Sequence, residues 1–433
     1  MLTNILKSRI LALSLALFFF LVYLFTRTFM GVYLIKFRIG ELAILFSLIV
    51  LIFSLIFYKR VNHLNKLLNS KIYFLNVLII ASFFLLVFIS KGSLLNTYTF
   101  KSSTYIWTIG FFYLGMFVFE KNKISKKFSG IFVFLLIYIY FYNIYGIPDS
   151  VQSIFLLFSD KFEYHKGSDL LVMFVASFFV FNKVLSNKRI ALEIFLIFTS
   201  LYFPLLLYKS RGAFIGFCIF VILELIFFNK VIKADIKRNI LLLSIMIIVL
   251  TQSVFVVTKS GYIQIDEIDE KMTQVATYRL PPKHEENFRY LFVEDSRLYS
   301  SDSNINWRLQ IWQDVIADMS KENNFLQGYG YNSKIPAMEN PYRKGDDGTN
   351  ENIHNYFLNI MARGGLIHLS LFSFFFYYVL KRNVLITKNF GILSLFIPLM
   401  FASFFDASME NSHYPLIFYF LLGMHFQSEK IFE

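Results

Sequence analysis

Long apolar segments alternate with short polar connections along most of the 433-residue chain. Segments of about 17–25 apolar residues match the thickness of a bilayer's hydrocarbon layer. The pattern therefore predicts an all-α polytopic membrane protein with about twelve transmembrane helices. The predicted spans are residues 10–26, 39–58, 72–90, 104–119, 128–146, 169–185, 190–208, 211–228, 239–257, 356–380, 386–405 and 413–427.

One long polar interval, residues 258–355, breaks this alternation. It divides the chain into nine predicted spans over residues 1–257, a large hydrophilic loop, and three predicted spans over residues 356–433. A chain that places about a hundred polar residues on one side of a membrane is expected to carry its chemistry there.

The loop contains one amphipathic segment near residues 304–320. Its apolar residues recur at helical spacing, which predicts a helix with Asn304 or Asn306 as its N-cap. We expect its face with Trp307 and Ile311 to lie on the membrane surface or on the spans. The turn-forming segment 327–330 is expected to end it.

Composition and charge narrow the possible partners. The chain carries a formal net charge of +13, but the loop itself holds 11 Lys and Arg against 16 Asp and Glu. The positive charge lies in the short connections, where it orients spans rather than binding nucleic acid. The single cysteine, Cys218, lies in an apolar segment and is expected to be a small buried residue.

The distribution of Lys and Arg predicts the orientation. With a cytoplasmic N-terminus, 21 of these residues lie in inside segments and nine in the short outside connections. The bias puts both termini in the cytoplasm and the large loop in the periplasm of a bacterium. The N-terminal apolar stretch lacks a small-residue cleavage site, so we interpret it as an uncleaved first span.

Arg211 lies in a tight outer connection between two predicted spans, followed by Gly212. One interpretation is an interfacial arginine that snorkels and caps a hairpin. The other is an anion site, because a guanidinium beside the N–H groups that open the next helix is a good phosphate receptor. Gly212 would permit close approach of another backbone.

Arg308 and His354 are candidates from the loop. Arg308, flanked by Trp307 and Trp312, is either a solvated or stacked side chain or a second cation for the same anion. His354 is either structural or a general base, because the dipole of a helix N-terminus favours the neutral imidazole. A neutral imidazole accepts a proton from a hydroxyl near pH 7.

Other polar residues rank lower. Asn355 is a candidate for orienting a sugar hydroxyl, and Gly364 and Gly365 are expected to let another helix approach. Further candidates for substrate binding or for lining a cavity are Arg279, Arg289, Trp312, Arg363, Asp406, Glu410 and His413. No D-x-D pair, P-loop, H-E-x-x-H or G-x-S-x-G motif is present, so no metal or other cofactor is expected.

Two cations and a neutral base at a membrane surface indicate a lipid diphosphate donor. Attack by an acceptor hydroxyl on the first sugar would release the lipid diphosphate, whose growing charge the arginines would offset. Direct displacement would invert the anomeric centre without a metal.

Three segments resemble the O-antigen ligase/O-antigen polymerase superfamily of bacterial inner-membrane glycosyltransferases. They are Ser210-Arg-Gly-Ala213; Trp307-Arg-Leu-Gln-Ile-Trp312 with Gly328-Tyr-Gly330; and His354-Asn-Tyr-Phe-Leu358 with Gly364-Gly365. Their order and spacing around a large loop match the family over roughly residues 195–425.

The resemblance implies a GT-C-like fold and metal-independent transfer of an undecaprenyl-diphosphate-linked glycan in the periplasm. It also implies essential roles for Arg211, Arg308 and His354. Members of the family commonly have a more basic loop than this one.

Three functions remain open at this stage. The favoured one is an O-antigen ligase, whose acceptor is lipid A–core. The second is an O-antigen polymerase, whose acceptor is another lipid-linked repeat unit. A flippase for the same lipid-linked glycan is the rival from another class, although transporters usually contain repeated halves with broken helices, which this sequence lacks.

Overall fold

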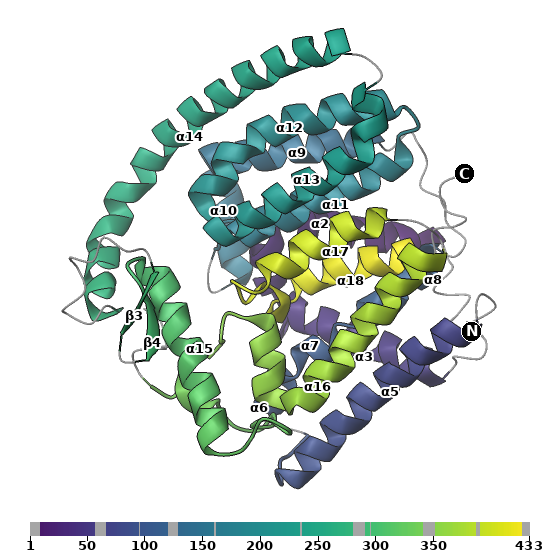
Figure 1. Ribbon diagram of the computed structural model, residues 1–433, viewed down its shortest axis with the longest axis vertical. Coiled ribbons are helices and arrows are strands. Elements are labelled where there is room, and N and C mark those ends of the chain that lie inside the picture. Colours follow the sequence, from purple (N-terminus) through teal and green to yellow (C-terminus); the bar gives the residue numbers. More distant parts are fainter. Residues whose placement is uncertain are drawn as a thin grey trace.

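The computed structural model describes residues 9–56, 66–94, 96–119, 129–159, 162–233, 236–279, 291–294, 296–340, 351–386 and 390–426. These residues form an all-α protein (Figure 1). Its longer helices are α2 (Arg9–Gly31), α3 (Ile39–Ile56), α5 (Lys66–Ile89), α8 (Gly110–Phe119), α9 (Ser129–Tyr145), α10 (Asp149–Phe158), α11 (Gly167–Val184), α12 (Lys188–Lys209), α13 (Arg211–Lys233), α14 (Ile236–Arg279), α15 (Ser303–Lys321), α16 (Tyr356–Lys381), α17 (Gly391–Ala402) and α18 (His413–Phe426).

Several short elements complete the described structure. Two-stranded antiparallel hairpins pair β1 (Tyr33–Leu34) with β2 (Phe37–Arg38) and β3 (Leu291–Glu294) with β4 (Arg297–Ser300). The short helices are α6 (Thr97–Ser102), α7 (Thr104–Trp107), η2 (Pro336–Met338), η4 (Arg382–Ile386) and η5 (Ser408–Glu410).

Eight helices of the described chain are long and apolar enough to cross a membrane. They are α2, α3, α5, α11, α12, α13, α14 and α16; α9 and α10, bent by 92° at their junction, would add a ninth as one broken span. Each of the twelve predicted intervals contains a helix, but α17 and α18 have 12 and 14 residues. The protein is thus a multi-pass α-helical membrane protein, and the number twelve and the GT-C-like arrangement stay predictions.

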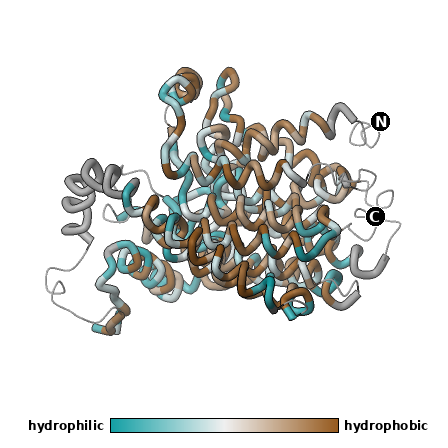
Figure 2. The backbone as a smooth tube through the Cα atoms, turned by 90° about the horizontal axis from the view of Figure 1, so that it is seen from above, coloured by the Kyte–Doolittle hydropathy of each residue, from teal (hydrophilic) through white to brown (hydrophobic). Residues whose placement is uncertain are grey.

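Burial separates the central helix from the peripheral ones. In α11, 89% of the apolar window is buried, whereas in α14 only 17% is buried. Phe174 of α11 shows how the centre packs, since its ring contacts Tyr202 of α12 and Phe217 of α13 at centroid distances of 5.0 and 4.9 Å. Figure 2 shows long hydrophobic stretches along the packed helices, and those at the periphery are available to lipid.

Glycine allows one very close helix contact. A Cβ atom added at Gly115 of α8 would lie 2.1 Å from the carbonyl oxygen of Phe420, and one at Gly423 of α18 would lie 1.9 Å from that of Phe112. Small residues on both helices let α8 and α18 approach backbone to backbone, as in other membrane bundles.

The large loop is built on α15, which lies beside the β3–β4 hairpin (Figure 1). The predicted helix near 304–320 is confirmed, but its N-cap is Asp302 rather than Asn304 or Asn306: the Asp302 carboxylate accepts from Ile305 N. Ile311 is fully buried in a cluster with Ile335 and Ala362. The apolar face of α15 therefore packs on the later loop segment around Ile335 and on the predicted span α16. Of the two predicted surfaces, it is the spans and not the membrane surface that this face contacts.

A second part of the loop crosses α16 where that helix is broken. Gly365 has φ 66° and ψ −170°, which interrupts the helical backbone. The backbone of segment 325–330 pairs with the interrupted turn, for example through Tyr329 N to Ala362 O at 2.7 Å and Leu366 N to Phe325 O at 2.8 Å. We expected another helix to approach Gly364 and Gly365. The backbone that approaches Gly365 is instead this loop segment, which supplies hydrogen-bond partners for the broken turn.

Candidate active site

Arg211 is the first residue of α13, as predicted, because the backbone of Ser210 is extended and ends α12. Its side chain is 63% exposed, and Nη1 lies 2.5 Å from Oδ2 of Asp302. The next residue packs closely on a distant connection: a Cβ atom added at Gly212 would lie 3.0 Å from Cβ of Phe405. The group close to Gly212 is thus the Phe405 side chain rather than a backbone, and it brings the α17–α18 connection (residues 403–412) to the start of α13.

Asp302 links this region to α15. Its Oδ1 accepts from Ile305 N at 2.9 Å while Oδ2 meets Arg211. The same helix carries Arg308 and Trp307, and the Trp307 ring lies 5.0 Å from the His354 imidazole in a T-shaped contact. One carboxylate thus caps α15 and ties it to the first residue of α13.

His354 lies two residues before α16, in a left-handed conformation with φ 56°. Its side chain is 21% exposed, and Nδ1 lies 3.9 Å from Oδ1 of Asp406. Burial lowers the pKa of His354, the Asp406 carboxylate raises it in part, and the charges of Arg308 and Lys166 lower it further. The imidazole is therefore neutral near pH 7, as predicted, although burial rather than the helix dipole is the main cause.

Asp406 is the closest carboxylate to this imidazole. Ser168 Oγ donates to its Oδ2 at 2.5 Å. Burial acts to raise the pKa of Asp406, but its interaction with His354, the charge of Arg27 and the hydrogen bond from Ser168 hold it well below its ordinary value. Asp406 is thus an anion that holds one side of His354, a placement that the sequence analysis ranked low.

A buried ionic cluster lies beneath Asp406. Asp169, with a fully buried side chain, lies 3.3 Å from Nε of Arg27 and 2.7 Å from Nε2 of His413. Arg27 and Asp169 were missed as site residues, because the sequence shows them only as charges at the ends of spans 1 and 6. They could have been suspected because an ionisable group at a membrane-spanning helix is costly unless it has a partner.

Two other predicted binding residues, Asn355 and Trp312, make hydrogen bonds to the backbone. Asn355 is the N-cap of α16, with Oδ1 accepting from Leu358 N at 3.0 Å. Trp312 Nε1 donates to the Ile353 carbonyl at 3.0 Å, which fixes the segment that precedes His354. Arg289 and the side chain of Arg279 lie outside the described residues.

Two cavities differ in position and character. The first, about 180 Å³, is called the α6–α16 cavity and adjoins the residues around His354. It is lined chiefly by Tyr98, Tyr105, Asn359, Arg363, Glu410 and Asn411.

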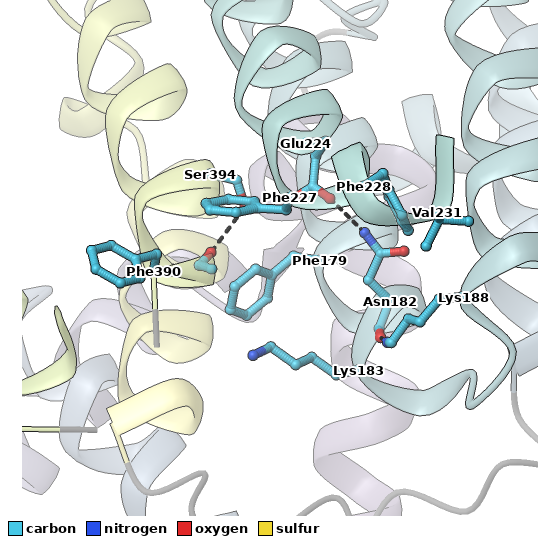
Figure 3. A pocket seen from close by; sticks show the side chains of 11 residues that line it. Phe179, Asn182, Lys183, Lys188, Glu224, Phe227, Phe228, Val231, Phe390 and Ser394 are labelled. Atoms are coloured by element: carbon cyan, nitrogen blue, oxygen red, sulfur yellow. Dashed lines mark hydrogen bonds between the residues drawn. The ribbon is translucent and has the colours of Figure 1, made fainter. Parts of the chain in front are cut away.

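The second cavity, about 570 Å³, is shown in Figure 3. It lies between the far ends of α11, α13 and α17 and has aromatic walls that include Phe179 and Phe228. There Asn182 donates to Glu224 at 2.7 Å, and Lys188 donates to the Leu185 carbonyl at 3.3 Å. Because these helices carry Ser168, Arg211 and Phe405 at or beyond their opposite ends, this larger cavity is remote from His354.

Residues 194–373 match the family model described as O-antigen ligase, a range that contains Arg211, Arg308 and His354. No curated protein matches the chain. The resemblance found in the sequence is thereby confirmed over these residues, which are similar to the O-antigen ligase family.

Proposed function

We propose that this protein transfers an undecaprenyl-diphosphate-linked glycan as a block to a sugar hydroxyl at the periplasmic face of a bacterial inner membrane. The observation that carries the proposal is the gathering of α13, α15 and the segment before α16 around Asp302, Trp307 and His354. Asp302 contacts Arg211, and Trp307, next to Arg308 in sequence, contacts His354, so segments far apart in sequence approach one another.

The arginines suit the donor. A diphosphate needs positive charge and N–H donors, and the first turn of α13 with the exposed guanidinium of Arg211 provides both. Arg308 lies close enough to His354 for its charge to act on the imidazole. A diphosphate bridging these arginines would compete with Asp302 for Arg211, and the 63% exposure of that side chain leaves it accessible.

His354 suits the acceptor. The acceptor oxygen forms a bond to the anomeric carbon while the bond from that carbon to the phosphate oxygen breaks, and the electron pair leaves with the lipid diphosphate. His354 takes the hydroxyl proton, and Asp406 beside Nδ1 stabilises the imidazolium that forms. Nδ1 faces the carboxylate, so Nε2 is the nitrogen assigned to the acceptor. The displacement inverts the anomeric centre and needs no metal.

The reaction is tested with purified protein, lipid-linked donor and either lipid A–core or a second lipid-linked repeat. Wild type should form the elongated glycolipid and release lipid diphosphate, whereas Arg211→Ala, Arg308→Ala and His354→Ala should each abolish transfer and leave membrane insertion intact. Vesicles that show flipping of the donor, with no glycosidic product from either acceptor, would replace this function by transport.

We favour the ligase, and a polymerase is the alternative. Deleting the gene separates the two. Loss of a ligase leaves lipopolysaccharide without O-antigen and accumulates lipid-linked polymer, whereas loss of a polymerase leaves core capped by a single repeat.

A further inference from the structure

The α6–α16 cavity shares chain segments with the candidate active site. Glu351 and Asn352, which lie just before His354, belong to its lining, and Asn359 follows one turn into α16. On the opposite wall, Glu410 lies four residues after Asp406 in the α17–α18 connection. The elements that hold the imidazole therefore also shape this cavity.

The chemistry of the lining differs from that around Arg211. Two tyrosines, Tyr98 and Tyr105, provide aromatic surface, while Asn359 and Asn411 provide amides. Such a mixture of aromatic faces and neutral donors and acceptors suits a sugar ring, which has apolar C–H faces and hydroxyls at its edge. A volume of about 180 Å³ is below the roughly 300–1,000 Å³ of pockets for drug-sized ligands, so it suits one sugar residue.

Arg363 is fixed before any ligand arrives. Its side chain is 4% exposed, Nη1 donates to the Ser333 carbonyl at 2.5 Å and Nη2 donates to the Tyr98 hydroxyl at 2.8 Å. The guanidinium also lies 5.3 Å from the centre of the Tyr98 ring. These contacts make one wall of the cavity rigid, as selective binding of a small ligand requires.

Two buried polar atoms in the lining have no hydrogen-bond partner among the described residues, Nε of Arg363 and Oε1 of Glu410. Burial raises the pKa of Glu410 to about 8, and the charge of Arg363 offsets part of this effect. At neutral pH the carboxyl is thus mainly protonated, so it both donates and accepts a hydrogen bond, as a sugar hydroxyl does. Buried polar groups normally have hydrogen-bond partners, so these two atoms suit a ligand that supplies them.

We infer that the α6–α16 cavity binds one neutral sugar residue of the acceptor, with Glu410 and Asn359 hydrogen-bonding its hydroxyls. This inference rests on the proposed glycan transfer and deepens it, because it assigns donor and acceptor to different walls around His354. The wall with Arg211 and Arg308 takes the diphosphate, and the α6–α16 cavity positions the sugar that carries the attacking hydroxyl.

Kinetics separate acceptor binding from catalysis. Glu410→Ala and Asn359→Ala should each raise the KM for the acceptor about three- to tenfold, the effect of one lost hydrogen bond, while kcat and the KM for the donor change less than twofold. Glu410→Gln should stay within about threefold of wild type, because an amide also donates and accepts. The exposed Glu339→Gln is the matched control for a change of one acidic side chain.

An unchanged acceptor KM in both alanine variants would overturn the inference, as would a Glu410→Gln variant as impaired as Glu410→Ala. Thermal melting of each purified variant establishes that it is folded.

Binding without turnover is measured by saturation-transfer NMR, using oligosaccharides released by mild acid from lipid A–core and from the lipid-linked repeat. Wild type should bind one of them through a single sugar residue, and Glu410→Ala should lose that signal. Wild-type protein that binds neither oligosaccharide overturns the inference. Binding that depends on Glu410, in a protein that forms no product, would retain the cavity's assignment and refute the proposed transfer.

Discussion

Replacing Asp406 by Asn isolates the contribution of one negative charge to the proposed base. Nδ1 of His354 and Oδ1 of Asp406 are 3.9 Å apart, and both side chains are less than a quarter exposed. With an effective dielectric constant near 20, unit charges at that separation attract by about 4 kcal/mol. Because the imidazolium forms only as the proton moves, the attraction acts on the transition state and corresponds to about a thousandfold in rate. The asparagine dipole retains part of it, so we expect kcat to fall about 10²- to 10³-fold.

The pH dependence of the Asp406→Asn variant tests the same role independently, through the direction in which the pKa of His354 moves. Burial lowers the pKa of His354, and Asp406 acts in the opposite direction. Removing the carboxylate therefore lowers this pKa further, so His354 stays neutral to a more acidic pH. The acid limb of kcat/KM should move to lower pH even though the plateau falls.

The assay is transfer of lipid-linked glycan by purified protein, followed as product glycolipid from about pH 4 to 9. Ser168→Ala is the control, because it removes the 2.5 Å hydrogen bond to Asp406 and leaves the negative charge in place. Ser168→Ala should reduce kcat less than Asp406→Asn does, because the charge that acts on the imidazole is still present. Full activity in Asp406→Asn, or an acid limb displaced to higher pH, would refute the assigned role.

Three further outcomes are expected. Gly365→Ala should lower stability by at least about 1–3 kcal/mol in denaturant unfolding, because its φ is 66° and the new Cβ would lie 2.1 Å from the Leu326 carbonyl; Gly130→Ala, with nothing within 4 Å, is the control and should be neutral. Asp302→Ala should cost about 0.5–2 kcal/mol through the lost cap of α15, whereas Asp302→Asn keeps the cap and should melt like wild type, since the pair with the exposed Arg211 contributes little. Transfer activity should persist in excess chelator, and a strict requirement for added divalent metal would contradict the proposed displacement.

The helices were predictable because a bilayer leaves the backbone few alternatives. Every backbone N–H and C=O in hydrocarbon must be paired within the chain, so an apolar segment of sufficient length becomes a helix. The same holds for α15, where apolar residues at helical spacing needed only a surface to pack on. Arg211 at the start of α13 was predictable for a local reason, since the polar segment Lys209-Ser-Arg-Gly212 between two spans must contain a helix end.

Contacts between distant segments were not predictable from periodicity. The pairing of segment 325–330 with the broken turn of α16 depends on the backbone of Gly365, which any helical pattern treats as one more small residue. Likewise, Asp406 follows His354 by 52 positions and reaches it only because α17 returns the chain to the end of the bundle at which α16 begins. Composition identified a polar connection there, but it gave no reason to rank Asp406 above its neighbours.

The part of the chain that matches the family is not sufficient to build the site. His354, Arg308 and Arg211 lie within residues 194–373, but Asp406, the carboxylate nearest the imidazole, lies beyond them. Asp406 is in turn held by Ser168 of α11, next to Asp169 and its buried pairs with α2 and α18. Removing one member of such a buried ionic cluster leaves another charge without its partner, at a typical cost of about 3–5 kcal/mol. The helices α2 and α18 therefore do more than anchor the protein, because their pairs with Asp169 help to position Asp406 beside the proposed base.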